Sequence, residues 1–215
     1  MDLRTLIKEH KIIAILRKLP LPKTIEYIGA LKNGGIKLIE VALNSDDACD
    51  QIRLIKQRFG DEVIIGAGTA VTVELAKNAV EAGARFLLTP SVHIDVLEFC
   101  SENGIEILPG VMTPTDVATC LRYNYHTLKL FPSSDLPPTY IKSLKGPFAD
   151  TDYVAVGGVS INNINNFFKN GFIGVGVGSS LVPLNYIKNN EWAKASESVA
   201  RLIDSIKGAG AYENQ

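Results

Sequence analysis

The feature that most constrains the fold is a regular alternation of short apolar runs with helical segments along the whole chain. Eight such strand–helix units follow one another at a spacing of about 22 residues. Strands that alternate with helices predict parallel pairing, and eight units predict a closed barrel. An open doubly wound sheet is the alternative, but it needs edge strands, and none of the eight runs is polar enough to form one. We therefore predict an α/β fold, a single (β/α)8 TIM barrel over residues 1–215 with a short N-terminal helix.

The predicted elements follow from apolar periodicity and from helix stop signals. The strands are residues 12–16, 37–43, 63–68, 86–90, 106–111, 126–131, 153–158 and 174–178. The helices are residues 2–10, 22–33, 46–59 (with Asn44 or Ser45 as cap), 72–82, 93–103, one that begins at Thr113-Pro114, 137–145, 161–170 and 190–206. Glycines that end helices precede several strands, at Gly34, Gly83, Gly104 and Gly171.

Charge and composition exclude several classes of function. The 22 basic and 23 acidic residues nearly cancel and form no basic tract, so we expect no nucleic-acid partner. The apolar runs are too short to span a bilayer, and the N-terminus lacks the apolar core of a signal peptide. The three scattered cysteines Cys49, Cys100 and Cys120 indicate buried thiols in a reducing compartment, and we expect a cytoplasmic protein. The three histidines lack metal-ligand spacing, so we expect no metal.

Two charged residues interrupt apolar strands, and alternation directs both into the barrel. Lys129 lies between two leucines, and Glu40 lies between Ile39 and Val41. If these apolar neighbours pack under helices, both charged side chains point inward. A desolvated lysine loses its proton more easily and becomes an amine nucleophile for a carbonyl. Two alternatives remain: an edge-strand lysine that faces water, and a buried network of Arg17, Glu40 and Lys129 without chemistry.

Barrel enzymes carry their sites at the C-terminal ends of the strands. Gly157-Gly158 and Gly178-Ser179 stand at the ends of the last two predicted strands, where backbone N–H groups of such barrels face a bound phosphate. The candidate substrate-binding residues at the strand ends are Arg17, Thr69, Thr89, Pro90, Val156, Gly157, Gly158, Gly178 and Ser179.

These motifs together resemble the 2-keto-3-deoxy-6-phosphogluconate (KDPG) aldolase family. The likeness covers about residues 10–206 and includes IAILR, GGIKLIEVALNS, IGAGTA, LPGVMTPTD, LKLFPSS, VGGVS and GVGSSLV, in that order. The resemblance implies a class I aldolase on a (β/α)8 barrel, with Lys129 as Schiff-base lysine and Glu40 as general acid/base. It also implies carboxylate binding near Arg17 and Thr69, and phosphate binding at Gly157, Gly158 and Ser179.

The resemblance further implies a phosphorylated keto acid as substrate, no cofactor, a homotrimer and a role of the Entner–Doudoroff type in carbohydrate metabolism. Two departures concern the choice of substrate. Residues 40–45 read EVALNS where the gluconate branch has Glu-Val-Thr-Leu-Arg-Thr, and residues 155–158 read AVGG where it has Pro-Thr-Gly-Gly. Both favour the sibling 2-keto-3-deoxy-6-phosphogalactonate (KDPGal) aldolases. A 4-hydroxy-2-oxoglutarate (KHG) aldolase, another sugar-phosphate barrel enzyme and a non-catalytic sugar-phosphate sensor are the remaining alternatives.

Overall fold

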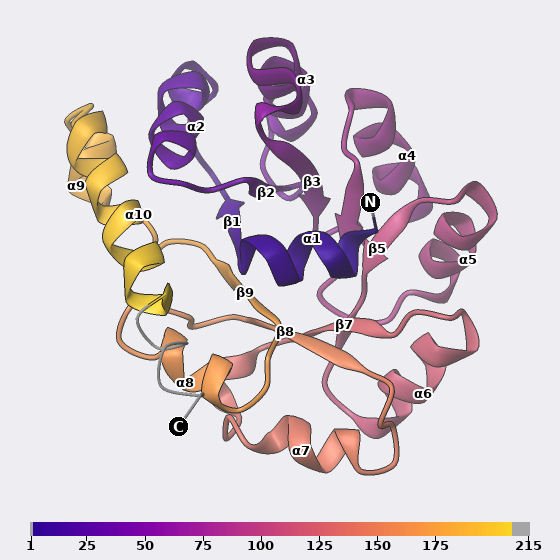
Figure 1. The fold of residues 1–215 in the computed structure, drawn as a ribbon. Helices are drawn as coiled ribbons and strands as arrows, with labels where there is room; N and C mark the ends of the chain where they lie inside the picture. Colours follow the sequence, from indigo (N-terminus) through magenta and orange to yellow (C-terminus); the bar gives the residue numbers. More distant parts are fainter. Residues whose placement is uncertain (1, 208–215) are drawn as a thin grey trace.

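The strands form a barrel of parallel strands that the helices surround (Figure 1). The computed structural model describes residues 2–207. Within this range the strand order is β5-β4-β3-β2-β1-β9-β8-β7-β6, and every pairing is parallel. The strands are β1 Ile12–Leu16, β2 Leu38–Ala42, β3 Ile64–Gly68, β4 Phe86–Leu88, β5 Glu106–Leu108, β6 Gly110–Val111, β7 Thr127–Leu130, β8 Asp152–Val156 and β9 Gly174–Val177.

The strands β5 and β6 are the two halves of one predicted strand, residues 106–111. Pro109 separates them, because proline has no N–H to donate to a ladder. The first half pairs with β4 and the second with β7, so one stretch of chain joins both ends of the strand order. The Lys129 N–H donates to the Pro109 carbonyl at 2.9 Å across this junction. The predicted closed barrel is therefore confirmed, with one strand interrupted.

The helices surround the barrel largely where periodicity predicts them. They are α1 Leu3–His10, α2 Thr24–Asn33, α3 Ala48–Phe59, α4 Val73–Ala82, α5 Ile94–Asn103, α6 Pro114–Arg122, α7 Tyr140–Lys145, α8 Ile164–Lys169, α9 Leu184–Lys188 and α10 Trp192–Lys207. Three short 3-10 turns join them: η1 Leu21–Lys23, η2 Gly60–Glu62 and η3 Ser133–Asp135. None of the helices within residues 2–207 has the length and apolar character of a membrane span.

Three details of the predicted helices change. The helices α7 and α8 are shorter than predicted, and α9 was not predicted at all. The prediction that Asn44 or Ser45 caps the third helix was wrong, because the N-cap of α3 is Asp47. The Ser45 hydroxyl instead accepts a hydrogen bond from the Lys18 N–H at 3.0 Å. By contrast, Thr113 caps α6 as predicted, in a capping box with Asp116.

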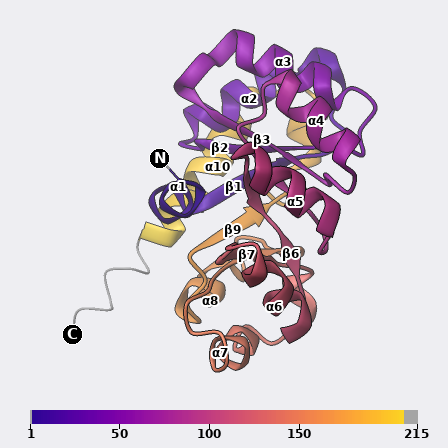
Figure 2. The same ribbon diagram turned by 90° about the vertical axis from the view of Figure 1, so that its right-hand side faces the viewer.

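Alternation along the strands separates two apolar cores. Outward-facing residues such as Ile39 and Leu128 pack against the helices. Inward-facing residues such as Leu38 and Val154 pack inside the barrel together with Leu3, Leu6 and Ile7 of α1. The helix α1 lies across one end of the barrel (Figures 1 and 2). It closes the barrel end opposite to the C-terminal ends of the strands.

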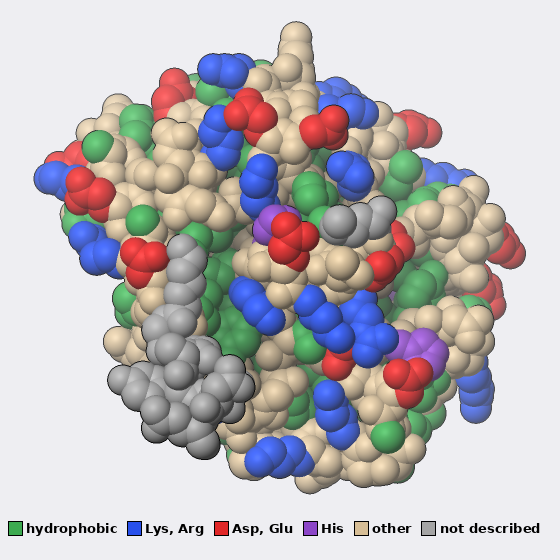
Figure 3. Space-filling view, viewed as in Figure 1, with side chains coloured by type: hydrophobic (Ala, Val, Ile, Leu, Met, Phe, Trp, Pro, Cys, Tyr) green, Lys and Arg blue, Asp and Glu red, His purple; other side chains and the backbone are tan. Residues whose placement is uncertain are grey.

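One buried carboxylate fastens α1 to the barrel. Asp152, at the start of β8, is 7% exposed. Its carboxylate binds Arg4 Nε at 2.8 Å and Lys8 Nζ at 2.9 Å, both from α1, and Lys145 Nζ at 3.5 Å. Burial raises the pKa of Asp152, but the hydrogen bonds and charges of Lys8 and Arg4 outweigh burial, so the pKa lies below its ordinary value. Figure 3 looks onto this face and shows several Lys and Arg side chains gathered on it.

Candidate active site

Lys129 occupies the interior of the barrel, as alternation predicts. Lys129 is 5% exposed, and its neighbours Leu128 and Leu130 pack in the core between the strands and the helices. Burial lowers the pKa of Lys129, the Glu40 charge opposes this effect and the Arg17 charge adds to it, so the net shift is downward. β7 pairs with β6 on one side and β8 on the other. The alternative of an edge-strand lysine that faces water is therefore wrong.

Glu40 lies on β2 and is 1% exposed. Its carboxylate lies against the α-carbon of Gly68 on β3, where a β-carbon would collide with it. Burial raises the pKa of Glu40, although the positive charges of Lys129 and Arg17 oppose the shift. Neither carboxylate oxygen has a hydrogen-bond partner among the described residues. A buried acceptor without a partner is costly, which is typical of a functional group rather than of a structural one.

Glu40 and Lys129 influence each other electrostatically without forming an ion pair. The positive charge of Lys129 opposes the rise in the pKa of Glu40, and the negative charge of Glu40 opposes the fall in the pKa of Lys129. None of the salt bridges among the described residues joins the two side chains. Arg17 is exposed at the end of β1 and acts on both from a distance. This arrangement differs from a bonded Arg17–Glu40–Lys129 network. It leaves a proton acceptor and an amine available to a third group.

A cavity of about 590 Å³ opens over the ends of β1, β8 and β9. Six of the predicted substrate-binding residues line this cavity, together with Phe131 and Ser160. The six are Arg17, Val156, Gly157, Gly158, Gly178 and Ser179. The two glycines after β8 have φ angles of 94° and 70°, a backbone conformation that favours glycine. The structure therefore brings the predicted anion loops and Arg17 to the mouth of the barrel.

The other three predicted residues, Thr69, Thr89 and Pro90, do not line this cavity. Thr69 directly follows Gly68, the glycine against Glu40, and has φ of 61°, which is uncommon for a β-branched residue. Thr89 is fully buried, and its hydroxyl accepts the Gly110 N–H at 3.0 Å. The backbone of Pro90 lies against Gly110. These residues surround the β3–β4–β6 side of the barrel mouth, so a substrate role for them remains a prediction.

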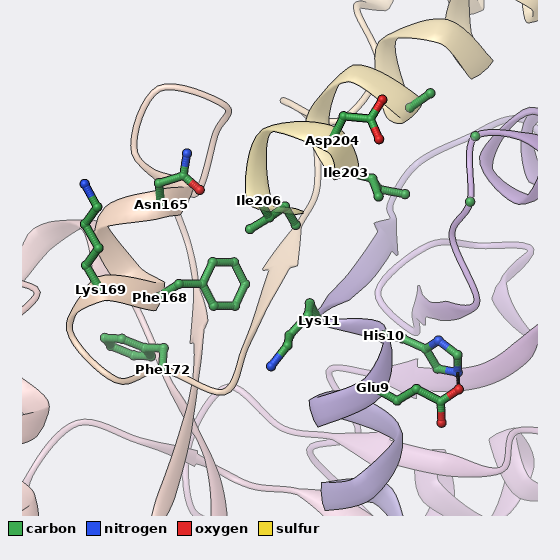
Figure 4. A pocket seen from close by; sticks show the side chains of 13 residues that line it. Glu9, His10, Lys11, Asn165, Phe168, Lys169, Phe172, Ile203, Asp204 and Ile206 are labelled. Carbon is green, nitrogen blue, oxygen red and sulfur yellow. Dashed lines mark ion pairs between the residues drawn. The ribbon is translucent and has the colours of Figure 1, made fainter. Parts of the chain in front are cut away.

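A second, larger cavity of about 730 Å³ lies among α1, α8 and α10 (Figure 4). Lys11, Phe168 and Ile203 are among its lining residues, and the ion pair between His10 and Glu9 lies at its border. None of the predicted site residues lines it. Among residues 2–207, no group of three or more His, Cys, Asp or Glu side chains is placed to hold a metal ion. Lys129 and Glu40 are buried inside the barrel and are not among the lining residues of either cavity, whereas Arg17 and the predicted anion loops line the cavity at the barrel mouth.

Comparison with known proteins agrees with this geometry. The sequence model of the KDPG and KHG aldolases matches residues 3–198. The chain belongs to the KDPG and KHG aldolase family. It is 34% identical over 199 residues to the 2-dehydro-3-deoxy-6-phosphogalactonate aldolase of Escherichia coli K12, covering 92% of this chain and 95% of that one.

Two solved structures of the family show the same fold. A native KDPGal structure is 31% identical, with a TM-score of 0.84 over 93% of this chain and 96% of that chain. The KDPG aldolase of Legionella pneumophila, with pyruvate captured at low pH as a covalent carbinolamine, is 27% identical. Its TM-score is 0.87 over 94% of this chain and 98% of that chain. The barrel mouth of this KDPG and KHG aldolase family member is therefore the candidate active site.

Two residues next to the buried lysine strand of this aldolase were not among the predicted site residues. The Phe131 ring centroid lies 5.1 Å from Lys129 Nζ. Alternation already places Phe131 on the face of Lys129, so the signal was present in the sequence. Ser133 is buried, donates to the Leu130 carbonyl at 2.7 Å and accepts the Val156 N–H at 3.2 Å. Ser133 thereby joins the lysine strand to β8, which no local pattern indicates.

Proposed function

We propose that this chain is a class I aldolase that cleaves a 2-keto-3-deoxy-6-phospho sugar acid to pyruvate and D-glyceraldehyde 3-phosphate. The observation that carries the proposal is the buried Lys129, whose pKa is lowered, next to a buried Glu40 without a bonded partner. A lysine in this state supplies a neutral amine that attacks a ketone. The names of the relatives, including the carbinolamine captured in one of them, support the same reaction.

The proposed reaction begins when the neutral Lys129 amine adds to the ketone carbon. Glu40, directly or through a water, moves the proton that lets the carbinolamine oxygen leave as water, and an iminium forms. Glu40 then takes the proton of the fourth-carbon hydroxyl, and the bond between carbons three and four breaks. Its electron pair flows into the iminium and gives an enamine, while the aldehyde leaves. Protonation of the enamine carbon and hydrolysis release pyruvate and restore the amine.

We place the substrate's two anionic ends in different parts of the proposed site. We assign the carboxylate to Arg17 and Thr69, near Glu40 and Lys129. We assign the phosphate to the loops after β8 and β9, at Gly157, Gly158, Gly178 and Ser179, since backbone N–H groups in such loops bind anions. Thr89 and Pro90 complete the proposed wall on the other side. The iminium serves as the electron sink, so the proposed reaction requires no metal or other cofactor.

We favour KDPGal over KDPG as the substrate, because Val156 stands where the gluconate branch has a threonine. A methyl group there cannot accept or donate a hydrogen bond, and an unpaired substrate hydroxyl is strongly disfavoured. The similarity to the E. coli phosphogalactonate aldolase supports this choice. Side-by-side assay of the two substrates tests it, and comparable rates with both would remove the discriminating role of Val156.

We also propose a cytoplasmic homotrimer. The scattered free cysteines, of which Cys100 and Cys120 are buried as predicted and Cys49 is only partly buried, support a reducing compartment. The large apolar side chains of Ile94, Met112, Ile161 and Leu184 are exposed on this chain and are candidates for subunit contacts. Sedimentation equilibrium tests the assembly, and a monomer at micromolar concentration would contradict it.

Borohydride trapping with pyruvate tests the proposed function. Reduction converts the iminium to a stable amine, and peptide mass spectrometry should place the adduct on Lys129. Lys129→Arg should abolish the adduct, whereas Lys142→Arg on α7 is the matched control and should retain it. No adduct on any lysine would overturn the Schiff-base proposal. Loss of activity in excess chelator that divalent metal restores would point to a metal-dependent aldolase.

A further inference from the structure

The loop after β8 leaves two consecutive backbone N–H groups without a protein acceptor. Gly158 and Val159 both line the cavity at the barrel mouth. Neither N–H donates a hydrogen bond to any residue in the described part of the chain. Consecutive N–H groups that converge on one point form an anion-binding nest. The proposed function places the substrate phosphate in this loop, and the role of the two N–H groups rests on that function.

The carbonyl of each of these two peptides is held in place by a hydrogen bond from a residue outside the glycine pair. The Gly157 carbonyl accepts the Ser134 N–H at 3.1 Å. The Gly158 carbonyl accepts Nδ2 of Asn163 at 2.9 Å. The C=O and N–H of a planar trans peptide point in opposite directions. Fixing the two carbonyls therefore fixes the directions of the N–H groups of Gly158 and Val159.

The glycines make such fixation necessary. Gly157 and Gly158 both have positive φ, and glycine populates positive and negative φ about equally well. A flip of the peptide between Gly158 and Val159 would turn a carbonyl oxygen toward the anion in place of an N–H. A side chain at Gly158 cannot stiffen the loop, because Ser134 occupies the space of a β-carbon there. The restraint has to come from groups other than the two glycines themselves.

Asn163 supplies this restraint with both ends of its side-chain amide. Its Oδ1 accepts the Ser160 N–H at 2.8 Å while its Nδ2 donates to Gly158. One end requires an acceptor and the other a donor, so only one orientation of the amide satisfies both. Ser180 adds a third restraint, since its hydroxyl donates to the Val159 carbonyl at 2.5 Å. The loop is held at residues 158, 159 and 160.

We propose that Asn163 is a positioning residue for phosphate binding, which holds the Gly158–Val159 peptide with its N–H toward the substrate phosphate. Asn163 itself acts through the loop backbone. Its role is therefore confined to the phosphate end of the substrate and leaves the chemistry at Lys129 unchanged.

Asn163→Ala tests the proposal, with Asn170→Ala as the matched control. Asn170 follows α8, and its Nδ2 donates to the Asn166 carbonyl without touching the loop. A hydrogen bond to a charged group typically contributes enough free energy to change a binding constant by a factor of about 10 to 100. We expect Asn163→Ala to raise KM for the phosphorylated substrate by about this factor. The kcat value should stay within about threefold of the wild-type value. The same holds for the pyruvate concentration that gives half-maximal borohydride trapping. Asn163→Asp keeps the acceptor for Ser160 but loses the donor to Gly158, so it should raise KM as well.

Binding of inorganic phosphate, followed by calorimetry, gives a readout that is independent of the aldol reaction. Wild type and Asn170→Ala should bind phosphate equally, and Asn163→Ala about 10- to 100-fold more weakly. Equal phosphate affinity in Asn163→Ala and wild type would overturn the proposal. So would a KM increase accompanied by an equal loss in pyruvate trapping, since that result indicates general damage. Failure of wild type to trap pyruvate would refute the proposed function instead.

Discussion

The carboxylate of Glu40 on β2 lies against the α-carbon of Gly68 on the adjacent strand β3. Gly68 is paired with Ala42, two residues beyond Glu40 on the same face of β2. The absence of a side chain at Gly68 gives Glu40 its place in the barrel interior. The position of the proposed proton carrier thus depends on a neighbouring strand as much as on its own.

Substitution of Gly68 by alanine should displace Glu40 while the barrel stays folded. The β-carbon would collide with the carboxylate, whereas the backbone at Gly68 does not have the positive φ that alanine disfavours. A placed acid/base contributes about 10²–10⁴-fold to rate, so Glu40→Gln should lower kcat by about that factor. Gly68→Ala should lower kcat by nearly the same factor, which steady-state kinetics will measure. Gly29→Ala is the control, because a β-carbon there meets nothing within 4 Å. Full activity of Gly68→Ala would contradict the placement of Glu40.

The pH dependence of Schiff-base formation should reveal the lowered pKa of Lys129. Only the neutral amine attacks, so the trapping rate with pyruvate should fall as pH drops through the Lys129 pKa. The inflection should lie below about 10.4, the value of an ordinary lysine. The Glu40 charge raises the Lys129 pKa, so Glu40→Gln should move the inflection to still lower pH. Trapping with cyanoborohydride from about pH 5 to pH 10 measures the inflection in wild type and in Glu40→Gln. An inflection that rises in Glu40→Gln would contradict the coupling.

Replacement of Val156 by threonine should shift the substrate preference toward KDPG. Val156 lies at the end of β8 and lines the cavity. A threonine has nearly the same shape and adds a hydroxyl that can pair with a substrate hydroxyl. We expect the ratio of kcat/KM for KDPG to that for KDPGal to rise by about tenfold or more. Val182→Thr, at another buried valine of the cavity wall, is the matched control. An unchanged ratio in Val156→Thr would remove this residue from the specificity determinants.

Asp152→Asn should destabilise the fold by about 1–3 kcal/mol, since hydrogen bonds to a charged group contribute about that much. The pKa of Asp152 lies below its ordinary value in the folded state. Its stabilisation is therefore complete above the unfolded pKa, about 3.9, and is lost as pH falls toward the folded pKa. Urea unfolding should show a clear difference between wild type and Asp152→Asn at about pH 7 that shrinks near pH 3. Asp61→Asn, with a fully exposed side chain, should show little difference at either pH. A constant difference at both values would contradict a charge-dependent contact.

The inward orientation of Lys129 and Glu40 was predictable because strand side chains alternate regardless of what surrounds them. The closed barrel was predictable for a related reason, since the repeat of strand and helix is a property of the local sequence. The interruption at Pro109 had a local signal as well, because proline cannot donate to a ladder. The predicted cap at Asn44 or Ser45 failed because a distant segment, at Lys18, uses the Ser45 hydroxyl.

The residues that escaped prediction depend on contacts that the three-dimensional path of the chain creates, whether the partners are 5 residues apart, as for Asn163 and Gly158, or 23 apart, as for Ser133 and Val156. Asn163 is an ordinary loop residue until the backbone path brings its amide to Gly158. Thr89 was predicted to bind substrate, and its buried hydroxyl accepts the Gly110 N–H from the interrupted strand next to it. Such partners are fixed by the three-dimensional path of the chain rather than by residue type, so a single sequence does not reveal them.

The contact between Arg4 and Asp152 also sets an order of events during synthesis. The two residues are 148 positions apart in the chain. A ribosome adds about 5–20 residues per second, so α1 is made several seconds before its carboxylate partner exists. Until then the apolar face of α1, with Leu3, Leu6 and Ile7, has no completed barrel to enter. The helix α1 is thus made well before the strand that fastens it, and its final contacts form only after β8 has been translated.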